Sequence, residues 1–297
     1  MRILHIDTGR EMRGGQWQVM HLLRGLRERG HQCCLLAREG APLAALAAGE
    51  GFTVKPAGIF SVRSACSRFD LTHAHDGRGH TLAALAGARP LLVARRVAFP
   101  IKKGFASRWK YGRAVRFLAV SQYVKKEMMA AGIGEKRISV VYDGVPALTP
   151  QPAGERILAP ATDDPGKGSA LAREAAALAG VSIEFSSNLP ADLPGCKLFL
   201  YLTHEEGLGS GALLAMSAGV PVIASAVGGL NEVIEDGVSG LLVGNRATTI
   251  AVRMRRLLED PDLAALLATQ GRLRVLERFS VQAMVDDTVR VYKECAA

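Results

Sequence analysis

The sequence predicts an α/β protein built from two Rossmann-like domains. Short apolar runs alternate with segments whose apolar residues recur at helical spacing, the pattern of βαβ units around a parallel sheet. The alternation stops once, in the proline-rich segment VPALTPQPAGE, and then restarts. A chain of 297 residues is long enough for two cores. We therefore expect domains at residues 1–150 and 151–279, with a terminal helix over 280–297.

The first domain opens with the apolar run RILHIDTG, expected to be its first strand. A polar loop follows, and then the segment WQVMHLLRGLRERG, whose helical spacing ends at a glycine. Helices are also expected in APLAALAAGEG and at TLAALAGA. The remaining strands are predicted in QCCLLAR, FTVKPAG, DLTHAHD, LLVARR, FLAVS and ISVVYDG.

The second domain repeats the alternation in a shorter form. It begins with RILAPAT, a helix over about 169–179 and VSIEF, followed by KLFLYLT, a small-residue helix and the strand VPVIAS. Two helical segments come next, ATTIAVRMRRLLED and PDLAALLATQGRLRVLERF, and SVQAMVDDTVRVYKECAA closes the chain as an amphipathic helix. The sequence shows no tandem repeat.

Composition limits the class of protein. Apolar residues make up 48% of the chain, yet no stretch of eighteen lacks a charge, so we expect neither a spanning helix nor a secretory leader. The odd number of cysteines, without metal-ligand spacing, indicates reduced thiols and argues against zinc. The expected location is the cytoplasm, at the inner face of a membrane. These cysteines are Cys33, Cys34, Cys66, Cys196 and Cys295.

The net charge of +9 is concentrated in one stretch. Residues 77–126 contain twelve lysines and arginines and no acidic residue, and aromatic residues are interleaved with the charges. Such a stretch is compatible with a solvated basic face, with an anionic membrane or acceptor, and with nucleic acid. Of these we expect contact with an anionic membrane or acceptor and no nucleic-acid partner. Nucleic-acid binding would instead predict steep dependence on salt.

Residues 204–243 carry the most informative pattern. A glycine-rich turn, a small-residue helix, a buried strand and a second diglycine turn follow one another within forty residues. Glycines let backbone N–H groups approach a ligand, and the start of a helix adds positive potential. The carboxylates of Glu205 and Glu206 stand directly before the first turn. Backbone donors beside a carboxylate suit a ligand with phosphates and hydroxyls, as a nucleotide sugar has.

This stretch resembles the donor-site pattern of glycosyltransferase family 4. The resemblance implies a GT-B fold with two Rossmann-like domains, a central cleft and a C-terminal helix that crosses back to the first; compared with the family, the second domain is shortened here. It also implies a retaining enzyme whose second domain binds the nucleotide sugar and whose first domain binds the acceptor. The residues in register are Glu206, Gly207, Gly209, Ala215, Met216, Gly219, Pro221, Val222, Ser225, Gly228, Gly229, Glu232, Asp236 and Gly240.

Two positions depart from the family pattern. The second glutamate of the pattern, associated in the family with the donor ribose, is Leu214 here, and leucine cannot accept a hydrogen bond. The arginine that accompanies the phosphate-binding lysine is Thr162. These departures leave a second possibility open, namely a non-catalytic relative that binds a ligand or partner.

The candidate catalytic residues are His75, Lys167 and Glu206. Lys167 lies between two glycines at a strand-to-helix turn, where an ammonium group can meet a diphosphate. His73 and His75 share one side of a strand; the resemblance assigns His75 to the sugar, and His73 is expected to support it. A metal site would need a third ligand that the sequence does not reveal. We therefore predict no metal and no cofactor.

Candidate binding residues fall into two groups. The donor group consists of glycine-rich turns and their neighbours: Gly14, Gly15, Gly207, Leu208, Gly209, Ser210, Gly228 and Gly229. The acceptor group consists of cations after the strand LLVARR: Arg95, Arg96, Lys102 and Lys103. ARRVAFP resembles a family stretch in which an acid takes the place of Ala98. The expected reaction moves a sugar from the nucleotide to a glycan or lipid-linked acceptor of the cell envelope.

Overall fold

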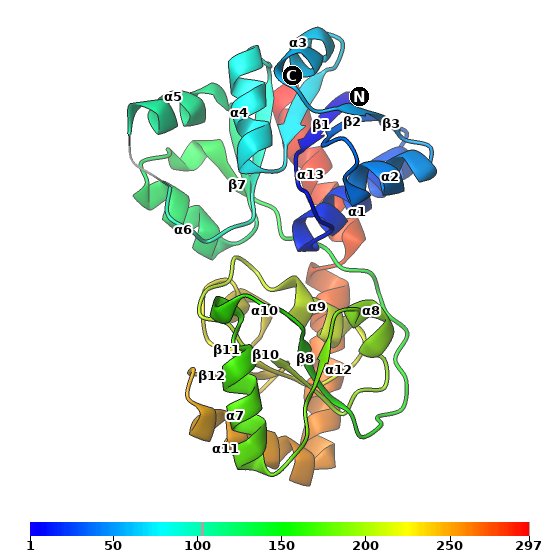
Figure 1. Cartoon of the computed structure of the whole chain (residues 1–297), viewed down its shortest axis with the longest axis vertical. Helices are drawn as coiled ribbons and strands as arrows, with labels where there is room; N and C mark the ends of the chain where they lie inside the picture. Colours follow the sequence, from blue (N-terminus) through cyan, green and yellow to red (C-terminus); the bar gives the residue numbers. More distant parts are fainter. Residues whose placement is uncertain (102–103, 297) are drawn as a thin grey trace. The chain divides into compact units, whose positions relative to one another are not determined.

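The computed structural model describes residues 1–101 and 104–296. It divides into two compact units, which are described separately here (Figure 1). Unit 1 comprises Met1–Gly144 together with the segment from Val281 onward, and unit 2 comprises Val145–Ser280. The N–H of Val145 donates to the carbonyl of Phe279 at 2.9 Å, which ties the proline-rich segment to unit 2.

Unit 1 is built on a seven-stranded parallel sheet in the order β3-β2-β1-β4-β5-β6-β7. Its central strands are buried, as expected for a parallel sheet covered on both faces, whereas the edge strand β3 is largely exposed. Their bounds are β1 Arg2–Asp7, β2 Gln32–Ala37, β3 Thr53–Pro56, β4 Leu71–Ala74, β5 Leu91–Arg95, β6 Arg116–Ala119 and β7 Ile138–Val140.

Eight helices of unit 1 lie within the described residues. Three of them, α3, α5 and α6, are not evident from the apolar periodicity; α5 has no buried residue at all, so it offers no apolar stripe to detect. The bounds are α1 Gly14–Glu28, α2 Pro42–Gly49, α3 Ile59–Cys66, α4 Gly77–Ala86, α5 Phe105–Arg113, α6 Gln122–Ala130, the 3₁₀ turn η1 Glu135–Arg137 and α13 Val281–Ala296.

The last helix, α13, packs on α1 and on the sheet of unit 1, as the resemblance implied. Leu22 and Leu26 of α1 share a core cluster with Val285 and Tyr292 of α13. A β-carbon on Gly25 would lie 2.5 Å from a methyl of Val285, so this glycine permits the close approach of the two helices. The chain therefore returns to unit 1 after completing unit 2.

Unit 2 is built on a five-stranded parallel sheet in the order β12-β11-β10-β8-β9. A 3₁₀ turn and one helix, α7, lead from β8 to β9, in agreement with the short connection that the sequence predicts. The strands are β8 Ile157–Pro160, β9 Glu184–Ser186, β10 Leu198–Tyr201, β11 Val222–Ser225 and β12 Leu241–Val243; the helices are η2 Pro165–Lys167, α7 Ser169–Ala179, α8 Leu189–Asp192, α9 Ser210–Ser217, α10 Leu230–Val233, α11 Ala247–Glu259 and α12 Pro261–Arg278.

In each parallel sheet, the carboxyl ends of the strands lie at one edge of that sheet, which is where open α/β sheets bind ligands. Among the described residues, no helix is long and apolar enough to cross a membrane.

Candidate functional site

Two turns at the carboxyl edge of the unit 2 sheet bring Lys167 and Glu206 together. Lys167 ends the 3₁₀ turn after β8, and Glu206 lies between β10 and α9. The Lys167 ammonium (Nζ) is 2.7 Å from Glu206 Oε2, with the two side chains 37% and 15% exposed. A cation and a carboxylate thus lie side by side directly before the N-terminus of α9.

The turn of Lys167 is fixed against the chain that leads to Glu206. The carbonyl of Gly166 accepts hydrogen bonds from the His204 N–H at 2.9 Å and from the Thr203 hydroxyl at 3.2 Å. Gly168 adopts φ +68°, and a β-carbon there would lie 2.6 Å from the carbonyl oxygen of Leu202. Only a glycine allows this conformation and this contact, which explains the glycine directly after Lys167.

The first predicted donor turn surrounds the start of α9. Gly209 takes φ +109° and caps the helix, Ser210 is its first residue, and the side chain of Leu208 is buried. The first turn of a helix leaves backbone N–H groups without partners inside the helix, so this end of α9 suits an anion. The N–H of Gly207 bonds to Glu206 Oε1 at 3.1 Å.

The predicted donor glycines Gly228 and Gly229 pack against the Glu206 turn. A β-carbon on Gly228 would overlap the carbonyl of Glu206, and one on Gly229 would overlap the carbonyl of Gly207. The N–H of Gly229 already donates to the Glu206 carbonyl at 3.1 Å. The structure therefore gives this pair a packing function, which sets the position of the turn that holds Glu206.

Sequence reasoning missed one residue of this site, Tyr201. Its hydroxyl donates to Glu206 Oε2 at 2.9 Å, the same oxygen that Lys167 approaches. A tyrosine at the end of an apolar strand resembles a core residue, so the sequence carries no clear sign of this role.

The two departures from the family pattern lie on the same edge of unit 2. Leu214 is a half-buried residue of α9 and offers no polar atom. Thr162 follows β8, where its hydroxyl accepts the N–H of Asp164 at 3.1 Å and adds no charge. Lys167 is therefore the cation that the predicted phosphate turn supplies.

In unit 1 the predicted His75 lies just beyond β4, in a cluster of three buried histidines. The parallel register places His5 of β1 beside His73 of β4, and His5 Nδ1 is 3.0 Å from His75 Nε2. His73 Nδ1 is 2.6 Å from the Tyr292 hydroxyl of α13. Burial lowers the pKa of His5 to about 3 and lowers the pKa values of His73 and His75 well below the usual 6.5. All three are therefore neutral at pH 7.

His5 is the third possible metal ligand beside His73 and His75, and the sequence alone does not reveal it. One nitrogen of each ring lies within 4.8 Å of one nitrogen of each other ring. However, the bond between His5 and His75 occupies one nitrogen of each ring. The positive charge of Arg96 also lowers the pKa of both His73 and His75, so it would oppose a bound cation as well. These contacts favour a neutral, hydrogen-bonded cluster.

The predicted acceptor arginines are both held inside unit 1. Arg96 Nε donates to Asp143 Oδ1 at 2.9 Å, with both side chains largely buried. Arg95 donates to the carbonyl of Phe99 and, at 3.4 Å, to the hydroxyl of Tyr111. Their guanidinium groups thus stabilise the ends of β5 and β7 in this state. Lys102 and Lys103, the other two predicted acceptor residues, lie outside the described residues.

The diglycine Gly14-Gly15 opens α1, at the carboxyl edge of the same sheet. A β-carbon on Gly15 would meet no atom within 4 Å, so the backbone faces open space there. Gln16 anchors this end of the helix by donating to Asp7 Oδ1 at 3.1 Å, and the N–H of Gly9 donates to the same carboxylate at 2.9 Å. Burial raises the pKa of Asp7. The loop before α1 is thus fixed at its base and open at its glycines.

Comparison with known proteins identifies both halves of the chain. Residues 12–147 match the family model described as Glycosyltransferase Family 4, and residues 171–274 match that of Glycosyl transferases group 1. The D-inositol 3-phosphate glycosyltransferase of Salinispora tropica is 40% identical over 111 residues, which are 37% of this chain and 23% of that protein. The alpha-maltose-1-phosphate synthase of Mycolicibacterium smegmatis is 34% identical over 112 residues, 35% and 29% of the two chains. The matched segments thus span about a quarter of these relatives.

Solved structures resemble the whole chain. HepE of Anabaena in complex with UDP superposes with a TM-score of 0.87 at 18% identity, over 99% of this chain and 100% of that one. A glycosyltransferase from Rickettsia africae ESF-5 gives a TM-score of 0.84 at 18% identity, over 99% and 98% of the two chains. At such identities the likeness concerns the fold, and it confirms the predicted α/β class with two Rossmann-like units.

Proposed function

The chain belongs to glycosyltransferase family 4, as its residues 204–243 indicated, and from this premise we propose that it transfers a sugar from a nucleotide-diphosphate donor to an acceptor hydroxyl. The observation that carries the proposal is the pair of Lys167 and Glu206 before the N-terminus of α9. Lys167 and the backbone N–H groups suit the diphosphate, while Glu206 can accept hydrogen bonds from sugar hydroxyls.

The proposed reaction retains the configuration of the sugar. The bond between the anomeric carbon and the diphosphate oxygen breaks, and the acceptor oxygen bonds to the same face of that carbon. The acceptor proton passes to the departing diphosphate, so no enzymatic nucleophile takes part. Lys167 and the start of α9 stabilise the negative charge that develops on the diphosphate. The proposal calls for no metal ion, because these groups supply the positive potential.

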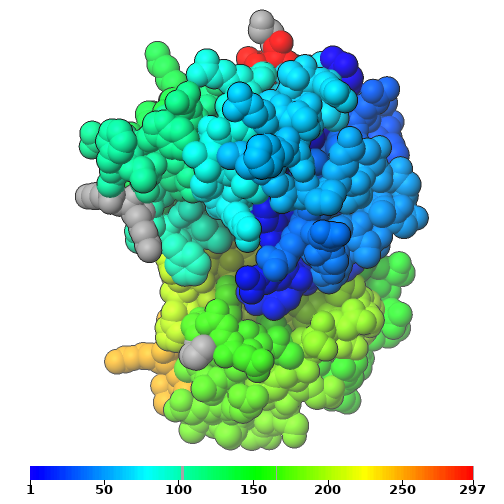
Figure 2. All heavy atoms as spheres, turned by 45° about the horizontal axis from the view of Figure 1, so that its top comes forward, coloured from blue at the N-terminus to red at the C-terminus, as the bar shows by residue number. Residues whose placement is uncertain are grey.

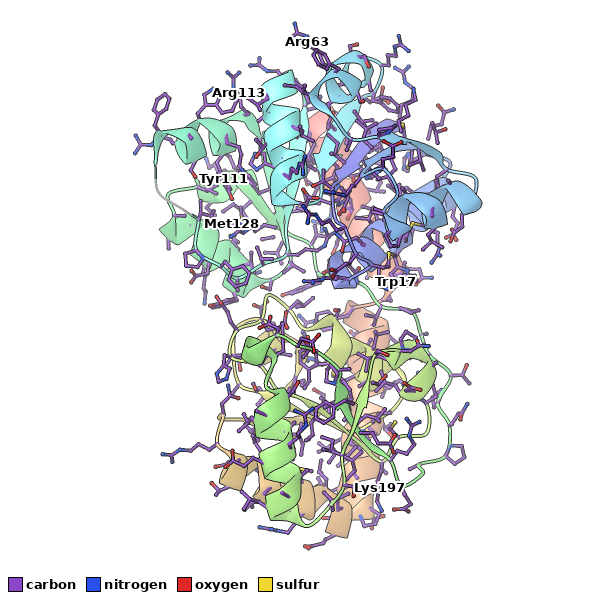
Figure 3. All side chains as sticks on the ribbon, viewed as in Figure 1. Trp17, Arg63, Tyr111, Arg113, Met128 and Lys197 are labelled. Atoms are coloured by element: carbon purple, nitrogen blue, oxygen red, sulfur yellow. The ribbon has the colours of Figure 1, made fainter. Side chains whose placement is uncertain are left out.

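A screen of nucleotide sugars tests the activity. UDP-glucose, GDP-mannose and related donors are offered with candidate acceptors, and released nucleoside diphosphate is measured. We expect Glu206→Ala and Lys167→Met to lower turnover by roughly a hundredfold or more. Lys197→Met is the matched control, since Lys197 is a lysine of the same unit (Figure 3) and pairs with Glu155 instead. Turnover that survives in Glu206→Ala would refute the site assignment.

A second candidate function is binding without transfer. Leu214 and Thr162 favour it, because each replaces a polar or charged donor contact of the family pattern by a residue that cannot make it. Calorimetry, together with the screen, distinguishes sugar transfer from binding without transfer. Donor binding without release of nucleoside diphosphate, across the full screen, would favour the binding module.

We further propose that the acceptor is a glycan or lipid-linked molecule of the cell envelope, reached at the inner face of an anionic membrane. The support comes from α5, whose exposed face combines aromatic and basic side chains. Phe105 is 87% exposed, and Arg113 and Arg63 point outward from α5 and α3 (Figure 3). Residues of the α3 and α4 segments form a continuous part of the unit 1 surface (Figure 2).

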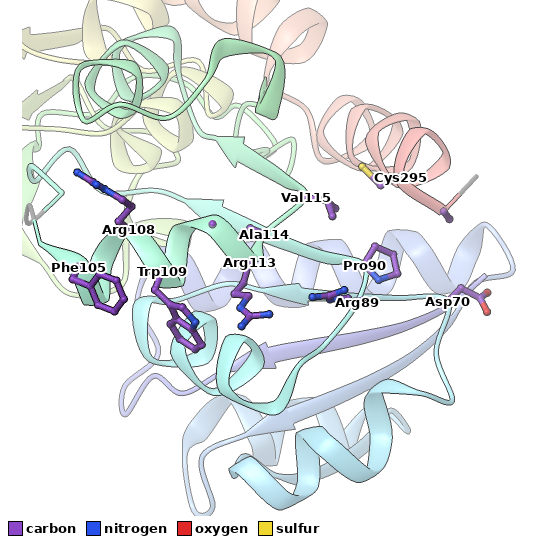
Figure 4. A pocket seen from close by; sticks show the side chains of 12 residues that line it. Asp70, Arg89, Pro90, Phe105, Arg108, Trp109, Arg113, Ala114, Val115 and Cys295 are labelled. Carbon is purple, nitrogen blue, oxygen red and sulfur yellow. The ribbon is translucent and has the colours of Figure 1, made fainter.

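A shallow pocket beside α5 strengthens this proposal. It has a volume of about 860 Å³ and is lined by Phe105 and Trp109 together with three arginines, while Asp70 lies at its far end (Figure 4). The guanidinium of Arg113 lies 5.1 Å from the centre of the Trp109 ring. Aromatic rings beside cations suit the interface of an anionic bilayer. The arginines are Arg89, Arg108 and Arg113.

A further inference from the structure

The carboxylate of Glu206 is held by three different groups. Its Oε2 atom is 2.7 Å from the Lys167 ammonium and accepts the Tyr201 hydroxyl at 2.9 Å, while Oε1 accepts the Gly207 N–H at 3.1 Å. Two of these partners are poorly suited to fix the orientation of the Glu206 carboxylate. The Gly207 bond comes from the adjacent residue of the same turn, and Lys167 sits on a long, partly exposed side chain.

Tyr201 is the rigid partner of the three. It is the last residue of β10, and its ring stacks on Phe199 with centroids 6.2 Å apart. A phenol has only two side-chain torsions, and packing fixes both. Burial first, and then the nearby charge and hydrogen bond of Glu206, raise the pKa of Tyr201 well above 10. The hydroxyl therefore stays protonated and donates to the carboxylate at any ordinary pH.

Helix α9 leaves space for the ring of Tyr201. A β-carbon on Gly211 would lie 2.6 Å from Tyr201 Cε2, and one on Gly209 would lie 3.5 Å from Cε1. Any larger residue at Gly211 would push the ring out of its place beneath α9. Tyr201 of the strand and Gly211 of the helix thus form a matched pair, five positions before and five positions after Glu206 in the sequence.

We propose that Tyr201 is a positioning residue, which holds the Glu206 carboxylate toward the hydroxyls of the donor's sugar. The inference rests on the proposed function of this site and extends it to a residue outside the glycine-rich pattern. When a diphosphate attracts the Lys167 ammonium, Glu206 keeps its bonds to Tyr201 and Gly207. The carboxylate therefore keeps its direction in the donor complex.

The test compares a nucleotide sugar with its nucleotide. UDP-glucose and UDP are titrated by calorimetry into the wild type and into Tyr201→Phe, with GDP-mannose and GDP in parallel. Tyr201→Phe keeps the ring and removes only the hydroxyl. We expect the nucleotide sugar to bind roughly tenfold more weakly, the range for a hydrogen bond to a charged group, and the free nucleotide to be affected less than about twofold. Tyr123→Phe, on α6 of unit 1, is the matched control.

A second measurement asks whether Tyr201 acts through Glu206. In a Glu206→Gln background, Tyr201→Phe should have little further effect on the affinity for the nucleotide sugar, because the charged acceptor has already been removed. Full additivity of the two changes would overturn the inference, and so would equal losses for sugar-bearing and free nucleotide. The same two changes, made singly and together, also give a coupling free energy of unfolding in the absence of ligand. If their effects on the free energy of unfolding were additive, Tyr201 and Glu206 would not interact through a hydrogen bond.

The outcomes separate the inference from the function on which it rests. A folded wild type that binds none of the four nucleotides contradicts the proposed function, and the inference falls with it. A wild type that binds UDP-glucose or GDP-mannose, together with a Tyr201→Phe variant of unchanged affinity, overturns the positioning role alone.

Discussion

Single residues decide how closely the two glycine-rich turns of unit 2 approach each other. Gly229 has no side chain, and its backbone lies against the carbonyl of Gly207 while its N–H donates to the carbonyl of Glu206. The conformation of Gly229 itself is ordinary for any residue, with φ −68°. The requirement for glycine here is thus purely one of space.

Gly229→Ala tests this close approach. The added methyl would push the turn of Glu206 away, and we expect the free energy of unfolding of unit 2 to fall by about 1–3 kcal/mol, a usual cost of overpacking. Donor affinity should fall too, because Glu206 moves. Gly244→Ala is the control, since a β-carbon there meets no atom within 4 Å. Equal urea midpoints for the two variants would contradict the packing role.

At the scale of elements, α5 is unusual because it packs beside α4 without fully burying a residue of its own. Its first residue, Phe105, is 87% exposed, and basic residues occupy its last turn. Tyr111 anchors the helix by stacking on the buried ring of Phe117, with centroids 5.5 Å apart. The apolar and basic groups of α5 are available for the anionic bilayer that we propose.

Phe105→Ser tests the contact of α5 with a membrane. Vesicles containing an anionic phospholipid should bind this variant roughly tenfold more weakly than the wild type, because one exposed aromatic ring no longer enters the interface. Sedimentation of protein with vesicles at low and at high salt measures the effect, and salt should weaken the binding of both proteins. Leu266→Ser, on α12 of unit 2, is the control and removes an apolar side chain that is 54% exposed. Equal binding of both variants would exclude α5 as the contact.

At the scale of the whole molecule, titratable groups are divided unequally between the units. Six of the seven histidines belong to unit 1, and the seventh, His204 of unit 2, is exposed. Burial lowers the pKa of His5 to about 3 and the pKa values of His21 and His80 to about 4. A histidine whose pKa is lowered in the native state takes up its proton at a higher pH in the unfolded state than in the native state. It therefore costs stability as pH falls below its unfolded value of about 6.5.

We expect acid to destabilise unit 1 before unit 2. Between pH 6.5 and the native pKa, each such histidine lowers the free energy of unfolding by about 1.4 kcal/mol per pH unit. The raised pKa of Asp7 acts in the opposite direction, since the native state then holds an extra proton at pH values above the usual 3.8. The loss between pH 6.5 and 5 therefore comes from the histidines.

Hydrogen exchange at pH 7 and pH 5, corrected for the intrinsic rate, measures this difference. Amides of β1 and β4 should lose protection at pH 5 by more than those of β10 and β11. His204→Gln should leave the pattern unchanged. An equal loss in the two units would show that the buried histidines do not control the acid response.

Local patterns in the sequence carry much of the fold. The periods of strands and helices depend on neighbouring residues, so the alternating elements, the parallel class and the interruption after the first domain could be predicted. The turn of Glu206 and the turn of Lys167 were also evident, because glycines and charges there follow one another closely in the chain. Helix α5 escaped prediction because periodicity records burial, and α5 has no fully buried residue.

The sequence by itself therefore determined the family, the fold class and the neighbourhood of the candidate site. Only the tertiary structure placed His5 beside His75, Asp143 beside Arg96, and Tyr201 beneath Gly211. The physical reason is that strand register and the close packing of a ring against a helix depend on residues far apart in the chain or on fractions of an ångström. No local period records such contacts, and one of them, the contact of Tyr201, is the one that we propose to orient the carboxylate of the candidate site.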